Sequence, residues 1–144
     1  HLPALSGDGA DVGAGIGVLS RHVLESPAVT TLSLIELDRR ALEAAKRNIV
    51  DPRAQFMWAD VREADLPTRL DFVVMNPPFH DVGVEDTSLG HAFIRASAAM
   101  LKTGGRCWLV ANRHLPYEAL LAECFTNNRL VADDAGFKIF ESVK

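Results

Sequence analysis

The sequence is poor in cysteine and carries no recognisable metal-binding motif. Of its 144 residues only two are cysteines, Cys107 and Cys124, and neither belongs to a CxxC motif or has a pair of histidines nearby. This composition disfavours a disulfide scaffold and a zinc site, and it is typical of a reducing cytosol. The spacing of histidine, aspartate and glutamate suggests no other metal centre. We therefore expect a cytoplasmic protein without a bound metal.

Long apolar runs and an excess of positive charge are missing as well. The longest apolar run, Cys107 to Ala111, covers about five residues, whereas a helix needs roughly 20 to cross a bilayer. The 15 lysines and arginines stand against 19 aspartates and glutamates, which gives a formal net charge of -4. No membrane partner is expected, and composition alone gives no sign of a nucleic-acid-binding surface.

The sequence does contain a regular alternation of strand-like and helix-like segments. Strands are predicted at Gly9–Val12, Thr31–Glu36, Gln55–Ala59, Asp71–Met75, Arg106–Ala111, Leu130–Ala132 and Phe137–Val143. The residues between the last two strands form a hairpin signal rather than a crossover. The pattern predicts an α/β fold: a Rossmann-like, doubly wound and mostly parallel seven-stranded sheet with a C-terminal antiparallel hairpin. Residues 1–144 form a single predicted domain, which does not begin with methionine and which we expect to be the C-terminal part of a longer protein.

Helices are expected between these strands. The first follows a glycine cluster and carries Ile16 on its inner face, and the second is capped by Asp38. The third begins near Ser88 and is stopped by Gly104-Gly105, and the fourth follows Pro116. Helices in these positions would supply the crossovers between parallel strands.

The first predicted strand runs into the glycine cluster Asp11-Val12-Gly13-Ala14-Gly15-Ile16-Gly17. In open α/β sheets the first strand-to-helix turn commonly forms the ligand site, and glycine lets the backbone approach a ligand closely. The G-x-G-x-G spacing departs from the dinucleotide fingerprint, and no Gly-Lys-Ser/Thr follows that would make a P-loop. Asp11 would repel a pyrophosphate and suits a cationic ligand such as a sulfonium amino acid. The alternative is a tight turn that binds nothing.

Two further carboxylates follow the next two strands. Glu36, with Leu37 beside it, ends the second strand near the spacing at which an acidic side chain accepts hydrogen bonds from both ribose hydroxyls. Asp60, with Val61 beside it, ends the third and could accept a hydrogen bond from an adenine amino group. The alternative for Glu36 taken alone is a helix N-cap or a favourable charge in the first turn of a helix.

The string Asn76-Pro77-Pro78-Phe79 after the fourth strand is the most informative in the chain. Two consecutive prolines remove two backbone donors, so the carbonyls of Asn76 and Pro77 can face a pocket. A carboxamide beside such a carbonyl offers two acceptors to an exocyclic amine, and Phe79 can stack on the ring that carries this amine. A Pro-Pro turn with a packed phenylalanine is the structural alternative. Beside the glycine turn, the string favours a site that aims an amine at an electrophile.

These residues together resemble the class I S-adenosylmethionine-dependent methyltransferases, in particular the branch that methylates amines. The strings Asn76 to Asp81 and Val110 to Tyr117 resemble the ribosomal-RNA guanine-N2 methyltransferases of the small-subunit methyltransferase C and large-subunit methyltransferase G type. The segment Gly136 to Phe140 is similar to their last strand, and the match covers almost the whole chain in order.

The resemblance implies S-adenosylmethionine as the cofactor and a role for each matched residue. The implied catalytic residues, which orient the target amine or wall its pocket, are Asn76, Pro77 and Phe79. The implied cofactor-binding residues are Asp11, Gly13, Gly15, Gly17, Glu36, Leu37, Asp60, Val61 and Asn76. The expected substrate-binding residues are Pro78, Phe79, His80 and Arg113. His80 follows the proline turn and could equally be a surface residue, and Arg113 follows the fifth strand at the same sheet edge.

The resemblance implies methyl transfer to guanine N2 of ribosomal RNA. The expected partner is ribosomal RNA or the small ribosomal subunit, and relatives carry an upstream domain on which RNA selection would depend. Adenine N6 and a protein glutamine amide are alternative amines for the same site. A degenerate methyltransferase fold that only binds RNA or a partner is the non-enzymatic alternative. The G-x-G-x-G spacing disfavours a further alternative, a nicotinamide-dependent oxidoreductase.

Overall fold

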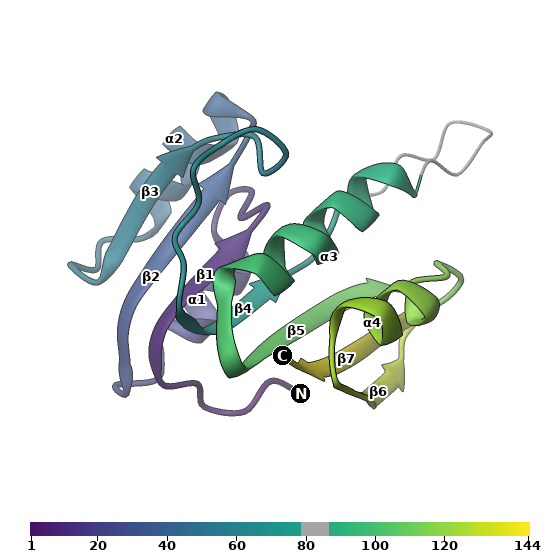
Figure 1. Ribbon diagram of the computed structural model, residues 1–144. Helices are drawn as coiled ribbons and strands as arrows, with labels where there is room; N and C mark the ends of the chain where they lie inside the picture. The colour runs from purple at the N-terminus through teal and green to yellow at the C-terminus, as the bar shows by residue number, and fades with distance from the viewer. Residues whose placement is uncertain (79–86) are drawn as a thin grey trace.

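The computed structural model describes residues 1–78 and 87–144, which form one sheet between two layers of helices (Figure 1). The strands are β1 (Gly7–Val12), β2 (Val29–Glu36), β3 (Ala54–Trp58), β4 (Leu70–Met75), β5 (Leu101–Asn112), β6 (Asn127–Asp134) and β7 (Phe137–Val143). The helices are α1 (Val18–Val23), α2 (Arg39–Asn48), α3 (Ser88–Met100) and α4 (Glu118–Cys124). The strand order is β3-β2-β1-β4-β5-β7-β6, in which β7 runs antiparallel to β5 and β6 and the other pairs are parallel. The predicted fold class is confirmed.

Each face of the sheet has its own apolar core. Helices α3 and α4 cover the face in front in Figure 1, where Ile94 and Leu121 pack in one cluster with Val73 of β4. Helices α1 and α2 cover the other face, where Ala45 packs in a second cluster with Val74. Neighbouring residues of β4 therefore point to opposite cores, and both valines are completely buried. This explains the continuous apolar run of β4, because a parallel strand covered on both faces has no polar side.

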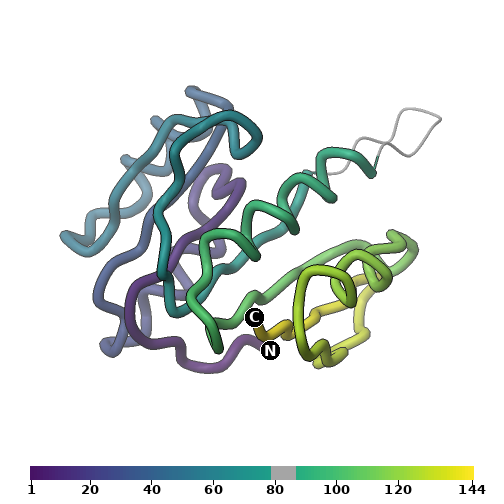
Figure 2. The backbone as a smooth tube through the Cα atoms, in the orientation of Figure 1, coloured from purple at the N-terminus to yellow at the C-terminus, as the bar shows by residue number. Residues whose placement is uncertain are grey.

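The connection between β3 and β4 contains no helix. Residues 59–69 run across the front face of the sheet before they reach β4 (Figure 2). Ala59, Val61 and Leu66 pack against the same core as α3 and α4. An irregular segment thus covers this part of the sheet and brings Asp60 and Val61 close to its carboxyl edge.

Two helix boundaries differ from the prediction. Helix α1 begins only after Gly17, so Ile16 lies in the loop and is 50% exposed, and the buried residues of α1 are Ser20 and Val23. Helix α3 ends at Met100 because Leu101 already has the extended backbone that begins β5. Gly104 and Gly105 therefore lie inside β5, where the pairing with β4 shifts register, and do not stop the helix.

The predicted Asp38 cap and the predicted C-terminal hairpin are confirmed. The Asp38 side chain caps α2 by accepting the N–H groups of Arg40 and Ala41. The β6–β7 hairpin turns through Ala135 and Gly136, both with positive φ as a tight two-residue hairpin turn requires. Both cysteines are free. No helix in the described part of the chain is long and apolar enough to cross a membrane.

Arg53, just before β3, ties the α1–β2 connection to the sheet. Its guanidinium donates to the backbone oxygens of Leu24 at 2.6 Å, Ser26 at 2.8 Å and Val29 at 3.1 Å. The carboxylate of Asp51 balances the charge of Arg53, with 2.8 Å between Asp51 Oδ2 and Arg53 Nη2. Only the planar, five-donor head of arginine can meet this many acceptors at once. The arginine therefore fixes the turn that leads into β2.

Replacing Arg53 by methionine should lower the free energy of unfolding by about 3 kcal/mol. The substitution keeps the apolar stem but leaves three carbonyls without their donor, at a net cost of about 1 kcal/mol each. Urea denaturation followed by circular dichroism measures this change. Arg47→Met, at an exposed position on α2, is the matched control and should change the free energy by less than about 0.5 kcal/mol. Equal effects of the two substitutions would contradict the structural role of Arg53.

Candidate functional site

The carboxyl ends of the parallel strands open into a cleft made of two adjoining cavities. One, of about 510 Å³, is lined by residues that follow β2, β3 and β4 and by α3. The other, of about 410 Å³, lies against the end of β1 and the start of α1. Gly13, Gly15 and Asn76 line both cavities, which therefore meet at these three residues. The cleft lies where β1 and β4 are neighbours while the chain continues from them toward opposite edges of the sheet.

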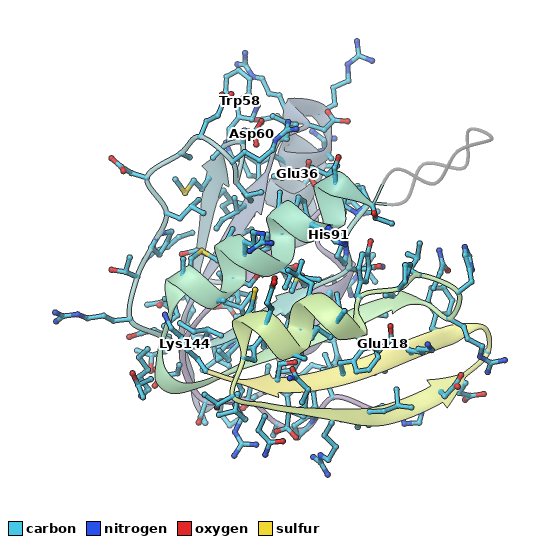
Figure 3. All side chains as sticks on the ribbon, turned by 45° about the vertical axis from the view of Figure 1, so that its right-hand side comes forward. Glu36, Trp58, Asp60, His91, Glu118 and Lys144 are labelled. Carbon is cyan, nitrogen blue, oxygen red and sulfur yellow. The ribbon has the colours of Figure 1, made fainter. Side chains whose placement is uncertain are left out.

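Most of the predicted site residues come together in this cleft. Those that line it are Asp11, Gly13, Gly15, Glu36, Leu37, Asp60, Val61, Asn76 and Pro78. Glu36 and Asp60 lie at the same end of the molecule in Figure 3. Gly17 and Pro77 line neither cavity, and Phe79 and His80 lie outside the described residues.

Glycine occupies the three positions 13, 15 and 17 of the loop between β1 and α1 for different structural reasons. A Cβ on Gly13 would lie 2.6 Å from the ring of Phe93, and one on Gly17 would lie 2.6 Å from Ile49. A Cβ on Gly15 would have no heavy atom within 4 Å, although its φ of 57° is left-handed. Packing against the Phe93 ring thus requires glycine at position 13, and the left-handed backbone with a φ of 93° favours it at position 17, whereas Gly15 presents its backbone to open space in the cleft.

Glu36 joins the end of β2 to this loop. Its Oε1 accepts the N–H of Gly15 at 2.9 Å, and its Oε2 accepts the N–H of Asp38 at 2.7 Å. Each carboxylate oxygen has two lone pairs, so both oxygens keep acceptor capacity. The side chain is therefore held in place in the cleft and can still accept hydrogen bonds from two hydroxyl groups.

Asp60 lies two residues beyond the end of β3 and is paired with Arg62. The arginine Nε and Nη2 donate to its carboxylate at 3.0 and 2.8 Å, and the Arg62 N–H donates at 2.9 Å. These hydrogen bonds lower the pKa of Asp60 from 3.8 to about 2, so it is ionised at neutral pH. Its charge is balanced locally, which suits it to accept a hydrogen bond rather than to bind a cation.

Asp11 is the buried carboxylate of the cleft. It is 1% exposed, and its Oδ2 accepts the hydroxyl of Ser20 at 2.6 Å. Burial raises the pKa of Asp11 from 3.8 to about 6, with a smaller upward effect from the charge of Glu36 and an opposing one from the Ser20 hydrogen bond. An acid that stays ionised at neutral pH despite this burial is suited to a cationic partner.

Asn76 follows β4 with its side chain exposed at the meeting point of the cavities, while Pro77 is buried and Pro78 is exposed. Arg113 is not brought to the cleft. Its guanidinium pairs with Asp133 of β6 and its backbone N–H donates to the carbonyl of Gly136, so it lies beside the turn of the C-terminal hairpin.

Sequence reasoning missed the part that helices contribute to the cleft. Leu89 and Phe93 line it from α3, and His22 lines it from α1. Their spacing is that of ordinary helix residues, so no sequence signal separates them from core or surface positions. Ser20 did carry a signal, because it is a hydroxyl on the buried face of a helix. Among the described residues, no group of three or more His, Cys, Asp or Glu could hold a metal ion.

The family model of the methyltransferase small domain matches residues 1–141, nearly the entire chain. The chain belongs to this family. Two curated relatives, the ribosomal RNA small subunit methyltransferases C of Shewanella pealeana and Shewanella halifaxensis, are 32% and 33% identical over 145 residues. The chain spans 42% of the length of each.

Solved structures of methyltransferases have the same fold. The T. thermophilus 16S rRNA N2 methyltransferase, in complex with AdoMet and guanosine, aligns with a TM-score of 0.79 at 31% identity over 95% of this chain and 37% of that one. Human N-acetylserotonin methyltransferase, in complex with SAM, aligns with a TM-score of 0.75 at 15% identity over 95% of this chain and 47% of that one. The second match shows a shared fold alone.

The glycines of this methyltransferase small domain should differ in their tolerance of alanine. Gly15→Ala should cost about 1 kcal/mol of unfolding free energy, because only the left-handed backbone is strained. Gly13→Ala should cost about 3 kcal/mol, because the new methyl group also collides with Phe93. Urea denaturation of the two variants side by side measures both values. Equal losses would mean that Gly15 is packed as tightly as Gly13.

The burial of Asp11 should make the stability of the methyltransferase small domain depend on pH. Because its pKa is raised on folding, its contribution is fully present below about pH 4 and is lost as the pH rises through about 6. Asp11→Asn removes this loss. Between about pH 4 and about pH 7.5, the unfolding free energy of the variant relative to wild type should rise by about 3 kcal/mol. Denaturant titrations of both proteins, without ligand, test this, and parallel pH profiles would rule it out.

Proposed function

We propose that this domain binds S-adenosylmethionine in the cleft and transfers its methyl group to the N2 amine of a guanine in small-subunit ribosomal RNA. The observation that carries the proposal is the position of Asn76, which lines both cavities where the glycine loop faces Glu36 and Asp60. The names of the 32–33% identical relatives support the ribosomal RNA, and the 31% identical T. thermophilus 16S rRNA N2 methyltransferase, in complex with guanosine, supports the guanine. Because the chain spans only part of their length, the substrate and partner belong to the proposal. A cytoplasmic location and the assignment of residues 1–144 as one catalytic domain are also parts of the proposal.

The residues of the cleft fit this cofactor in charge and size. Asp11 and Glu36 line it, and a ligand with a sulfonium and an ammonium group is better matched to these two carboxylates than a pyrophosphate is. The two cavities, of about 510 and 410 Å³, fall in the range of small-molecule sites. Open space at Gly15 leaves room for a ligand against the backbone.

Each carboxylate takes one part of the cofactor in this proposal. Asp11, beneath the glycine loop, receives the methionine ammonium, and Glu36 receives the ribose hydroxyls with the acceptor capacity left by Gly15 and Asp38. Asp60 receives the adenine amino group. Leu37, Val61 and the α3 residues Leu89 and Phe93 supply apolar walls around the adenine end.

The proposed chemistry consists mainly of positioning. When bound, the cofactor supplies an electrophilic methyl group. Guanine N2 is a weak nucleophile because its lone pair is delocalised into the ring. The Asn76 carboxamide oxygen, at the meeting point of the cavities, accepts one amine hydrogen, and the carbonyl of Pro77, whose ring is buried outside both cavities, is assigned the other. Holding both hydrogens localises the lone pair and aims it along one direction. No strong general base is needed, because the nitrogen becomes acidic once it is methylated and then releases its proton.

Asn76→Ala should lower methyl transfer to ribosomal RNA by about 100-fold, while the affinity for S-adenosylhomocysteine stays within about threefold of wild type. The loss follows from removing one of the two acceptors that orient the amine. Transfer of a tritiated methyl group measures the rate, and calorimetry measures the affinity. Asn127→Ala, an exposed asparagine at the start of β6, is the matched control and should behave as wild type.

The same assay separates the competing functions. Small subunits, free ribosomal RNA, DNA and a release-factor protein are offered in parallel, and mass spectrometry identifies the methylated nucleoside or amino acid. N2-methylguanosine supports the proposal. Methylated adenine or glutamine would reject the guanine assignment, and cofactor binding without transfer to any substrate would favour a binding module. Unchanged turnover of Asn76→Ala would reject the proposed mechanism.

A further inference from the structure

Asp11 and Ser20 form a polar pair inside the apolar interior. Asp11 lies in β1 between Leu34 of β2 and Val74 of β4, and Ser20 lies on the inner face of α1. The two residues are 1% and 0% exposed, and the hydroxyl donates to Oδ2 of the carboxylate at 2.6 Å. Burying a carboxylate among apolar neighbours is unfavourable unless a donor compensates it. Ser20 is that donor.

Asp11 is also one of the residues that border the ligand site. Asp11 lines the smaller cavity together with Gly13 and Gly15, whereas Ser20 does not line it. The hydroxyl therefore contacts the carboxylate from the protein interior, and the cavity lies against Asp11 under the glycine loop. A carboxylate held by Ser20 in this way has a defined orientation before any ligand arrives.

We propose that Ser20 is a positioning residue for the cofactor: its hydroxyl keeps Asp11 ionised and oriented to receive the methionine ammonium. This inference rests on the proposed function, because it concerns how the same cleft binds S-adenosylmethionine. Ser20 touches neither cofactor nor substrate in this proposal and acts only through Asp11.

The charges around Asp11 define the pH range in which this matters. Burial raises the pKa of Asp11 to about 6, the Ser20 hydrogen bond lowers it, and the charge of Glu36 raises it. Strands β2 and β4 place apolar residues beside it, and His22 of α1 is the other titratable group that lines this cavity. Without the hydroxyl, the pKa of Asp11 should rise further, so that protonation competes with ammonium binding close to neutral pH.

Calorimetry with S-adenosylhomocysteine as the probe tests the inference at two pH values. If the pKa of Asp11 rises by about one unit, Ser20→Ala should weaken binding relative to wild type by about threefold at about pH 6.5, where the ionised fraction of Asp11 falls by that factor, and should leave binding nearly unchanged at about pH 8.5. Ser20→Thr, which keeps the hydroxyl, should restore most of the affinity at the lower pH. Circular dichroism and thermal melting show that each variant is folded.

Two further variants separate a positioning role from a structural one. In an Asp11→Asn background, adding Ser20→Ala should change the affinity by less than about twofold, because the residue through which Ser20 acts is already neutral. The ratio of the affinities of Ser20→Ala and wild type for S-adenosylhomocysteine should keep its pH dependence when His22 is replaced by glutamine in both proteins.

The outcomes distinguish this inference from the proposed function. If wild type does not bind S-adenosylhomocysteine, the proposed function fails. Two results would overturn only the role of Ser20, provided that wild type binds. In one, Ser20→Ala lowers the affinity by the same factor at both pH values; in the other, it lowers the affinity as much in the Asp11→Asn background as in wild type.

Discussion

The site depends on the parallel pairing of β1 with both β2 and β4. From β1 the chain proceeds through β2 to β3 at one edge, and from β4 it proceeds to β5 on the other side. The connections therefore leave the shared carboxyl edge in opposite directions, which opens a crevice between them. The glycine loop directly follows β1, Asn76 directly follows β4, and Glu36 is the last residue of β2. Their proximity is thus a consequence of strand order, although more than 60 residues separate Gly13 from Asn76 along the chain.

Much of this arrangement was predictable because strands and helices leave different apolar periods in the sequence. Strand β4 and helix α3 could be recognised from their patterns, and residues at strand ends could be grouped because parallel strands share one carboxyl edge. Contacts made by long polar side chains left no such pattern. The Arg53 hydrogen bonds to three carbonyls, and the pairing of Arg113 with Asp133 instead of a place in the cleft, depend on backbone positions that only the folded chain creates.

The three carboxylates of the cleft show how one edge of a sheet provides different acids. Asp60 is kept ionised by an arginine two residues away, and Glu36 is held by two backbone N–H groups. Asp11 has a single hydroxyl donor in an apolar environment and is the least stable as an anion. The pKa of a carboxylate thus follows from what surrounds it in space, and the position at a strand end does not determine it. The least satisfied acid is the one best placed to gain from a cationic ligand.

The buried Asp11 also links ligand supply to folding. A ligand that binds only the folded state adds to its stability by mass action, and one that neutralises a buried carboxylate adds most where that charge is uncompensated. Under the proposed function, the empty domain is the less stable form and the cofactor completes its interior electrostatics. The fraction of folded chain, and with it the resistance to proteolysis, would then rise with cofactor concentration, so that protein abundance follows the supply of methyl donor.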